Sequence, residues 1–265
     1  MIFMNRLAVL FLTSVWCFGC SQSNDPTARN TDQPDLGGDA IRQQSLQTLS
    51  KGGFHAADWL PTAGHRANVP GKLRPIREVA QRLMALDALF TWASAPEDAV
   101  ATDRLKAYVD RNDLRAHLTE EERAVLALSR ESARAQHGAG IGWRLENMWA
   151  LAWVLGFDSP PDPMLGQVPD DISRAVVMEF LPGLDASVDD LLKKAKPRTQ
   201  QEVIALEDIF YCSHNAVRSA QTGSKTSIPA DFDPVSDGGA IHERRHALTW
   251  AISPDTEWDE TDLST

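Results

Sequence analysis

Apolar residues recur every three or four positions along most of the chain after residue 38, the spacing that places them on one face of an α-helix. Residues 74–94 are the clearest case, with apolar side chains at Val79, Leu83, Leu86 and other positions. Residues 141–156 are apolar on nearly all sides after Asn147, which predicts a buried central helix. The same reasoning predicts further helices at 39–51, 102–118, 170–181, 187–195, 199–222 and 239–252.

Three short motifs mark where helices begin. Residues 119–122, 187–190 and 199–202 each place a Ser or Thr three positions before an acidic residue, the pattern of a capping box. No long run alternates between apolar and polar residues, and residues 175–180 alone could form a strand. The predicted loops differ widely in length. The sequence therefore predicts an all-α fold, a single irregular multi-helix domain over residues 39–265.

The N-terminus has the composition of a targeting signal. Residues 7–18 are mainly apolar, follow one basic residue, and are too short for a comfortable membrane span. The stretch ends in Gly19-Cys20, which resembles the site at which bacterial lipoproteins are cleaved and acylated, although Cys17 stands where Leu is usual. We expect a signal peptide at 1–19 and a lipid on Cys20; an ordinary signal peptide is the alternative.

A polar segment separates this signal from the first predicted helix. Residues 20–38 contain one large aliphatic side chain, Leu36, so they can bury too little to offset the entropy lost on ordering. We expect a flexible linker between the acylated Cys20 and the helical domain. This predicts a protein secreted across the inner membrane and lipid-anchored in the cell envelope, with Ser21 favouring the outer membrane.

Charge and cysteine content restrict the possible functions. The chain has 26 Lys and Arg against 37 Asp and Glu, a net charge of −11, which excludes the basic surface of a nucleic-acid-binding protein. The expected cleavage removes Cys17 and acylation uses Cys20, so Cys212 remains as a free thiol that more often fills a core than catalyses. We predict no cofactor, because no P-loop, dinucleotide-binding glycine motif or nucleophile elbow is present.

Residues 242–246 match a short zinc-binding pattern. His242 and His246 share one face of a predicted helix and could bind Zn²⁺, while Glu243 could activate a metal-bound water. The two intervening residues are both Arg, whose charge disfavours a cation. A zinc-dependent hydrolase using these residues is therefore the alternative function, and a helix face that matches the pattern by chance is the preferred interpretation.

A row of polar side chains predicts a second kind of site. Glu207, Tyr211, His214 and Arg218 share one face of the predicted helix 199–222, and we expect them to be half-buried. With charged residues of other helices they could line a cleft for an anionic or zwitterionic small molecule. The preferred interpretation of these charges is instead a buried salt-bridge network, in which Arg144 meets Glu146 or Glu243 near His214. The candidate cleft residues are Arg82, Trp143, Arg144, Glu146, Tyr211, His214, Glu243, Arg244 and Trp250.

Several motifs, in their order along the chain, resemble one known family. They are Arg77-Glu78-Val79-Ala80-x-Arg82, Trp143-Arg144-x-Glu146, Tyr211-x-x-His214, Glu243-Arg244-x-x-Ala247-Leu248-x-Trp250 and Trp258-Asp259. Together they resemble the bacterial domain-of-unknown-function family 4272 over about residues 41–265. The resemblance implies a mainly helical domain and no known reaction, ligand or catalytic residue. We therefore predict a membrane-anchored binding or interaction module whose partner is an envelope protein or a small anionic ligand.

Overall fold

A computed structural model describes residues 38–224 and 227–265, so the predicted signal peptide and Cys20 lie outside the described residues. Within this part the chain forms α-helices and no strand; Arg66 and Val69 make one isolated β-bridge. The all-α prediction is confirmed. The helices are α1 (Gly38–Lys51), α2 (Ile76–Ser94), α3 (Thr102–Arg111), α4 (Glu120–Ala127), α5 (Arg130–Ile141), α6 (Arg144–Val154), α7 (Asp170–Ala175), α8 (Val188–Lys194), α9 (Gln200–Gln221) and α10 (Ser236–Ala251), with short helices η1 (Leu114–His117), η2 (Val176–Phe180) and η3 (Trp258–Glu260).

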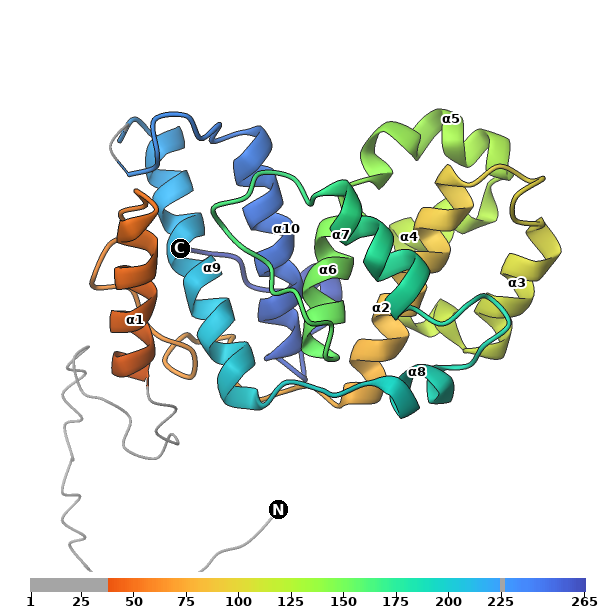
Figure 1. Ribbon diagram of the computed structural model, residues 1–265, viewed down its shortest axis with the longest axis horizontal. Helices are drawn as coiled ribbons and strands as arrows, with labels where there is room; N and C mark the ends of the chain where they lie inside the picture. The colour runs from red at the N-terminus through yellow and green to blue at the C-terminus, as the bar shows by residue number, and fades with distance from the viewer. Residues whose placement is uncertain (1–37, 225–226) are drawn as a thin grey trace, which may run out of the picture. The chain divides into compact units, whose positions relative to one another are not determined.

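Five helices follow one another through the body in an order unlike their order in the sequence. α1 packs on α9, α9 on α10, α10 on α6, and α6 on α2, as Figure 1 shows from left to right. In the same view, α3 lies to the right of α2 and α5 lies above it. α6 is thus covered by helices on two sides, which explains why its apolar residues are not confined to one face. Trp149, near its middle, is 1% exposed.

The three predicted capping boxes are confirmed. At the start of α4, α8 and α9, the Ser or Thr side chain accepts a hydrogen bond from the third helical backbone N–H. The acidic side chain at that third position accepts one from the backbone N–H of the Ser or Thr. Each box satisfies two backbone donors that a helix start would otherwise leave unpaired.

Several predicted helix boundaries were wrong, for local reasons. The helix expected at 102–118 breaks after Arg111, because Asp113 has a φ of 53° in the left-handed region, and η1 follows it. The central helix starts at Arg144, three residues later than expected, since Ile141 ends α5. The segment 175–180, which could have been a strand, is the end of α7 and a π-helical turn.

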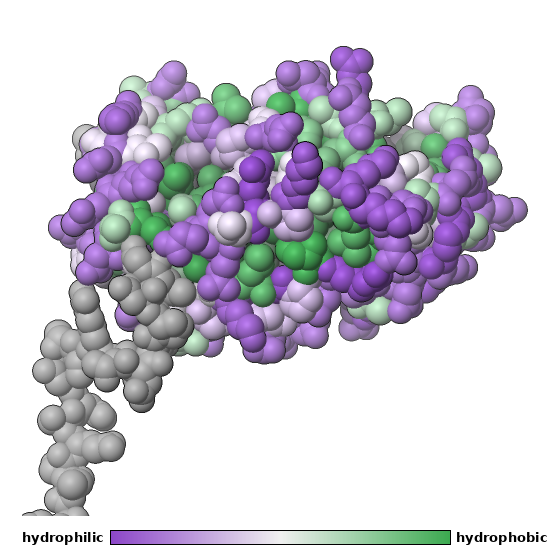
Figure 2. All heavy atoms as spheres, turned by 60° about the horizontal axis from the view of Figure 1, so that its bottom comes forward, coloured by the Kyte–Doolittle hydropathy of each residue, from purple (hydrophilic) through white to green (hydrophobic). Residues whose placement is uncertain are grey.

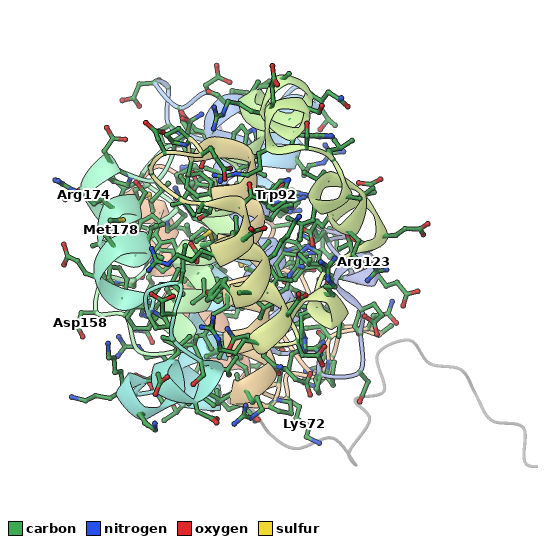
Figure 3. The ribbon with its side chains drawn as sticks, turned by 90° about the vertical axis from the view of Figure 1, so that its right-hand side faces the viewer. Lys72, Trp92, Arg123, Asp158, Arg174 and Met178 are labelled. Carbon is green, nitrogen blue, oxygen red and sulfur yellow. The ribbon has the colours of Figure 1, made fainter. Side chains whose placement is uncertain are left out.

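The surface of the body is mostly polar. On the face in Figure 2, apolar residues form separate patches among polar side chains. The side view in Figure 3 shows Arg174 and Met178 pointing outward from α7 and η2, and Met178 is 72% exposed. Across the described ranges, no helix combines the length and the apolar character that spanning a bilayer requires.

Candidate functional site

The side chains predicted to share one cleft lie in several different environments. Arg82 pairs with Glu122, and Arg244 pairs with Glu146. Tyr211 and His214 lie beside Arg245. Trp250 packs under Arg74, whose guanidinium carbon is 4.0 Å from the ring centroid. A fifth group, Trp143, Arg144 and Glu243, lines an open groove.

The polar row on α9 is buried rather than half-buried at three of its four positions. Glu207 is 0% exposed; it accepts hydrogen bonds from Arg66 at 2.9 Å and from the Thr249 hydroxyl at 2.8 Å. Tyr211 packs against guanidinium groups, with Arg66 4.2 Å and Arg245 4.8 Å from its ring centroid. The row is buried because α9 packs between α1 and α10, so polar residues on its sides need internal partners.

His214 is held as a neutral acceptor by a buried arginine. Arg245 is 0% exposed and donates a hydrogen bond to His214 Nδ1. It also donates to the carbonyl oxygens of Leu263 and Ser264, at 2.8 and 2.9 Å. Burial, and then the positive charge of Arg245, lower the pKa of His214 far below its usual range. The imidazole is therefore uncharged at neutral pH and unsuited to general-acid catalysis there.

Glu146 and Arg244 join α6 to α10. Arg244 Nε lies 2.7 Å from the Glu146 carboxylate, and its other nitrogens donate to the carbonyl oxygens of Asp162 and Gly166 at 2.9 and 2.6 Å. Its guanidinium carbon is 4.7 Å from the Trp149 ring centroid. Each guanidinium nitrogen is therefore engaged, so this pair fixes the loop between α6 and α7 and offers little to a ligand.

Arg82 and Glu122 form a second internal pair. Two nitrogens of Arg82 donate to the two carboxylate oxygens of Glu122, at 2.6 and 2.9 Å. The Arg82 guanidinium carbon is also 3.9 Å from the Trp258 ring centroid. Both members of the pair are buried, at 1% and 2% exposed. This pair fixes α4 against α2.

The residues of the zinc-binding pattern have other partners. His246 Nε2 donates a hydrogen bond to the carbonyl oxygen of Trp258 at 2.8 Å, and burial lowers its pKa to about 4. The His242 ring packs edge-on against His214, with centroids 5.2 Å apart. No three His, Cys, Asp or Glu side chains in residues 38–224 and 227–265 gather as metal ligands would. Burial also raises the pKa of Cys212 to about 12, which keeps this thiol protonated.

The remaining candidates face a groove of about 700 Å³ between α2, α4, α5, α6 and α10, which we call the Arg144 groove. Its volume lies in the range of small-molecule sites. Trp143 stands at the start of α6 and packs so closely on α10 that a Cβ at Gly239 would lie 2.9 Å from its ring. The groove has apolar walls formed by Leu89, Val125, Leu128 and Ile141. Its polar lining includes Glu121, His137, Arg144 and Glu243.

Arg144 differs from the buried arginines of the described body. Its side chain is 30% exposed, and its closest carboxylate oxygen, on Glu122, is 3.6 Å away and already bound to Arg82. Its guanidinium donates no hydrogen bond to any described residue. The buried arginines donate to carboxylate or carbonyl oxygens; they are Arg42, Arg66, Arg74, Arg82, Arg130, Arg244 and Arg245.

Glu243 also lines the groove, and Asn147 hydrogen-bonds to it. The Asn147 amide nitrogen donates to the Glu243 carboxylate at 3.0 Å and to the Glu243 carbonyl at 2.7 Å. Glu243 forms no ion pair with a described residue. Asn147 is 0% exposed, yet its Oδ1 has no hydrogen-bond partner within the described part.

A family model described as a domain of unknown function, DUF4272, matches residues 41–261. The chain belongs to this family. The resemblance found in the sequence motifs is thereby confirmed for the helical domain. No curated protein and no solved structure matches the chain. The family description gives no activity. Among the charged residues that no strong ion pair occupies, Arg144 and Glu243 both line the Arg144 groove.

The sequence analysis missed partners that pair across the fold. Glu122 was interpreted only as a helix cap, and Arg245 only as a charge unfavourable to zinc. Asn147 was noted only as the last polar residue before an apolar run. A usable signal was present at Glu122, because a capping carboxylate has a second oxygen that can accept from another helix.

Proposed function

We propose that the helical domain is a binding module that holds a small amphipathic anion in the Arg144 groove. The observation that carries the proposal is the half-buried Arg144 guanidinium, which donates no hydrogen bond to a described residue. A guanidinium presents five donors in a plane that matches a carboxylate or phosphate. At 30% exposure these donors can bind water in the free protein, and an anion that replaced this water would form charge-assisted hydrogen bonds with them.

The walls of the groove favour an anion with an apolar portion. Leu89, Val125, Leu128 and Ile141 come from different segments and line one space with Arg144. An aliphatic group placed against them would gain about 25 cal/mol for each Å² removed from water. The apolar walls therefore supply affinity, and Arg144 fixes the orientation of the charged end.

The first test is direct binding of aliphatic carboxylates of increasing length. We expect 4-methylpentanoate to bind and Arg144→Met to weaken it at least tenfold, since the anion loses its partner. Isothermal titration calorimetry on the purified full-length protein measures this. Arg123→Met, at the exposed position on α4 marked in Figure 3, is the control and should bind as the wild type does. Equal affinity in wild type and Arg144→Met, or no binding by any carboxylate tested, would contradict the proposal.

We also propose that a lipid on Cys20 anchors this domain in the bacterial envelope. The apolar leader, Gly19-Cys20 and the polar linker support this, as does one exposed aromatic residue. Trp59 is 75% exposed, and Arg42, near the start of α1, donates to the carbonyl oxygen of Pro61 at 3.3 Å. Trp59 thus lies near the point where the linker joins the domain. A tryptophan there suits the interface of a membrane.

Cys20→Ala should abolish incorporation of labelled palmitate and leave unprocessed precursor or a soluble form. The acyl chain needs the Cys20 sulfur, whereas Cys17 lies inside the expected leader. Cys17→Ala is therefore the matched control and should keep the label. Autoradiography of the immunoprecipitated protein provides the measurement, and equal labelling of wild type and Cys20→Ala would contradict acylation.

A further inference from the structure

The Arg144 groove contains hydrogen-bond acceptors as well as donors. Whether each of these groups already has a partner in the protein indicates what kind of ligand would bind. Glu243 lines the groove and is half-buried, with one hydrogen bond to its carboxylate from Asn147 at 3.0 Å. No Lys, Arg or His side chain of the described body forms an ion pair with it. A simple anion would satisfy Arg144 and leave this carboxylate without a counter-charge.

Asn147, a buried neighbour on α6, holds Glu243 in place. Its amide nitrogen donates to both the carboxylate and the carbonyl of Glu243, so exchanging the nitrogen and oxygen would place two acceptors against each other. Oδ1 must therefore be the atom left over, on a side chain that is 0% exposed.

The polar side chains discussed above come from adjacent turns of two helices, α6 and α10. Arg144 and Asn147 are three positions apart on α6, so they lie on one helix face. Glu243 lies four positions after Gly239 on α10, one turn from the point where Trp143 packs. Arg144 thus brings a donor group, and Glu243 an acceptor, to the lining of one groove.

We infer that the ligand is a zwitterion with an apolar body, either a free aliphatic amino acid or a short peptide. Its carboxylate binds Arg144, and its ammonium donates to the Glu243 carboxylate. Its side chain packs against Leu89, Val125, Leu128 and Ile141. The inference rests on the proposed function and adds the requirement for an ammonium group.

Four probes separate the parts of this inference. L-leucine carries both charges, 4-methylpentanoate lacks the ammonium, 3-methylbutylamine lacks the carboxylate, and leucyl-leucine separates the charges by a peptide unit. We expect L-leucine or leucyl-leucine to bind at least tenfold tighter than either singly charged probe in calorimetry on the full-length protein. If L-leucine binds more tightly, the ligand is a free amino acid; if leucyl-leucine does, it is a short peptide.

A variant pair tests the role of Glu243. Glu243→Gln should weaken the preferred zwitterion about tenfold and leave 4-methylpentanoate within twofold, because only the ammonium loses its partner. Glu179→Gln, at an exposed position on η2 away from the groove, should change neither affinity. Melting curves of both variants establish that they are folded.

The outcomes distinguish the two proposals. Two results would overturn the zwitterion and leave the proposed anion site at Arg144 standing. One is binding of 4-methylpentanoate as tightly as the better zwitterion. The other is a Glu243→Gln variant that keeps the wild-type preference. Failure of all four probes to bind overturns the zwitterion; if longer carboxylates also fail to bind, the proposed function is overturned with it.

Discussion

Glu207→Gln should lower the free energy of unfolding by about 3–5 kcal/mol, the usual cost of breaking a buried ion pair. Glu207 is 0% exposed and pairs with Arg66, and Arg245 lies close enough for its charge to act on the same carboxylate. The substitution keeps the shape of the side chain and removes its charge. The guanidinium groups of Arg66 and Arg245 would then stay buried with less negative charge beside them than in the wild type. Chemical denaturation followed by circular dichroism at pH 7 measures the loss.

Glu243→Gln is the matched control for this prediction. Glu243 is half-buried, accepts one side-chain hydrogen bond and pairs with no cation of the described body, so the change should cost less than about 1 kcal/mol. The contrast separates a charge that the fold requires from one that is available to a ligand. Similar losses in both variants, or a small loss in Glu207→Gln, would show that the two carboxylates are misassigned.

The pH dependence of Glu207→Gln gives a further check. Burial alone would raise the pKa of the Glu207 carboxyl, but the paired Arg66 holds that pKa below its usual value. Because the pKa is lower in the folded state, the stabilisation is present above the unfolded-state pKa and is lost as the pH falls through the folded-state pKa. The difference between wild type and variant should therefore shrink in acid.

The helices could be predicted from the sequence because their signals are local. Capping residues three positions apart and apolar residues three or four apart are short-range patterns, and they located the starts of α4, α8 and α9. The break at Asp113 depends on one residue adopting φ 53°, which hydrophobic spacing does not register. The division between α4 and α5 has a local signal as well, since Ser129 accepts from the backbone N–H of Ser132.

The site was harder to predict because charge pairing is a property of the tertiary fold. Arg82 and Glu122 are 40 positions apart, and Arg66 and Glu207 are 141 apart. The prediction that Arg144 meets Glu146 or Glu243 was wrong, because Arg244 binds Glu146 and the carboxylate nearest Arg144 is that of Glu122. Arg144 has no hydrogen bond to Glu122 because Arg82 already binds both oxygens of that carboxylate. This competition becomes visible only when α2, α4 and α6 are placed together.

Asp87 is a buried carboxyl group without a cation. It lies on α2, is 4% exposed, and accepts one long hydrogen bond, 3.3 Å, from the Tyr108 hydroxyl on α3. No described residue forms an ion pair with it. Burial raises the pKa of Asp87 from 3.8 to about 7, and the Tyr108 hydrogen bond offsets only part of that effect. The folded protein therefore holds a proton on Asp87 over a pH range in which the unfolded chain has released it.

Asp87→Asn should consequently become more stable relative to the wild type as the pH rises. Since the folded-state pKa is raised, the wild-type side chain is most favourable below the unfolded-state pKa and loses stability as the pH rises toward 7. Asn keeps an acceptor for Tyr108 and does not ionise. Each tenfold change in proton affinity is worth about 1.4 kcal/mol, so the difference between the two proteins should shift by about 3–4 kcal/mol between pH 4 and pH 8.

The comparison of two pH values removes the fixed cost of the substitution. Any penalty from burying the Asn amide is the same at pH 4 and pH 8, so it cancels in the shift. Free energies of unfolding from urea titrations at several pH values provide the measurement. Asp58→Asn, at an exposed position, is the control, and its curve should run parallel to that of the wild type. A parallel curve for Asp87→Asn as well would mean that Asp87 does not hold its proton in the fold, and that an unidentified partner stabilises its charge.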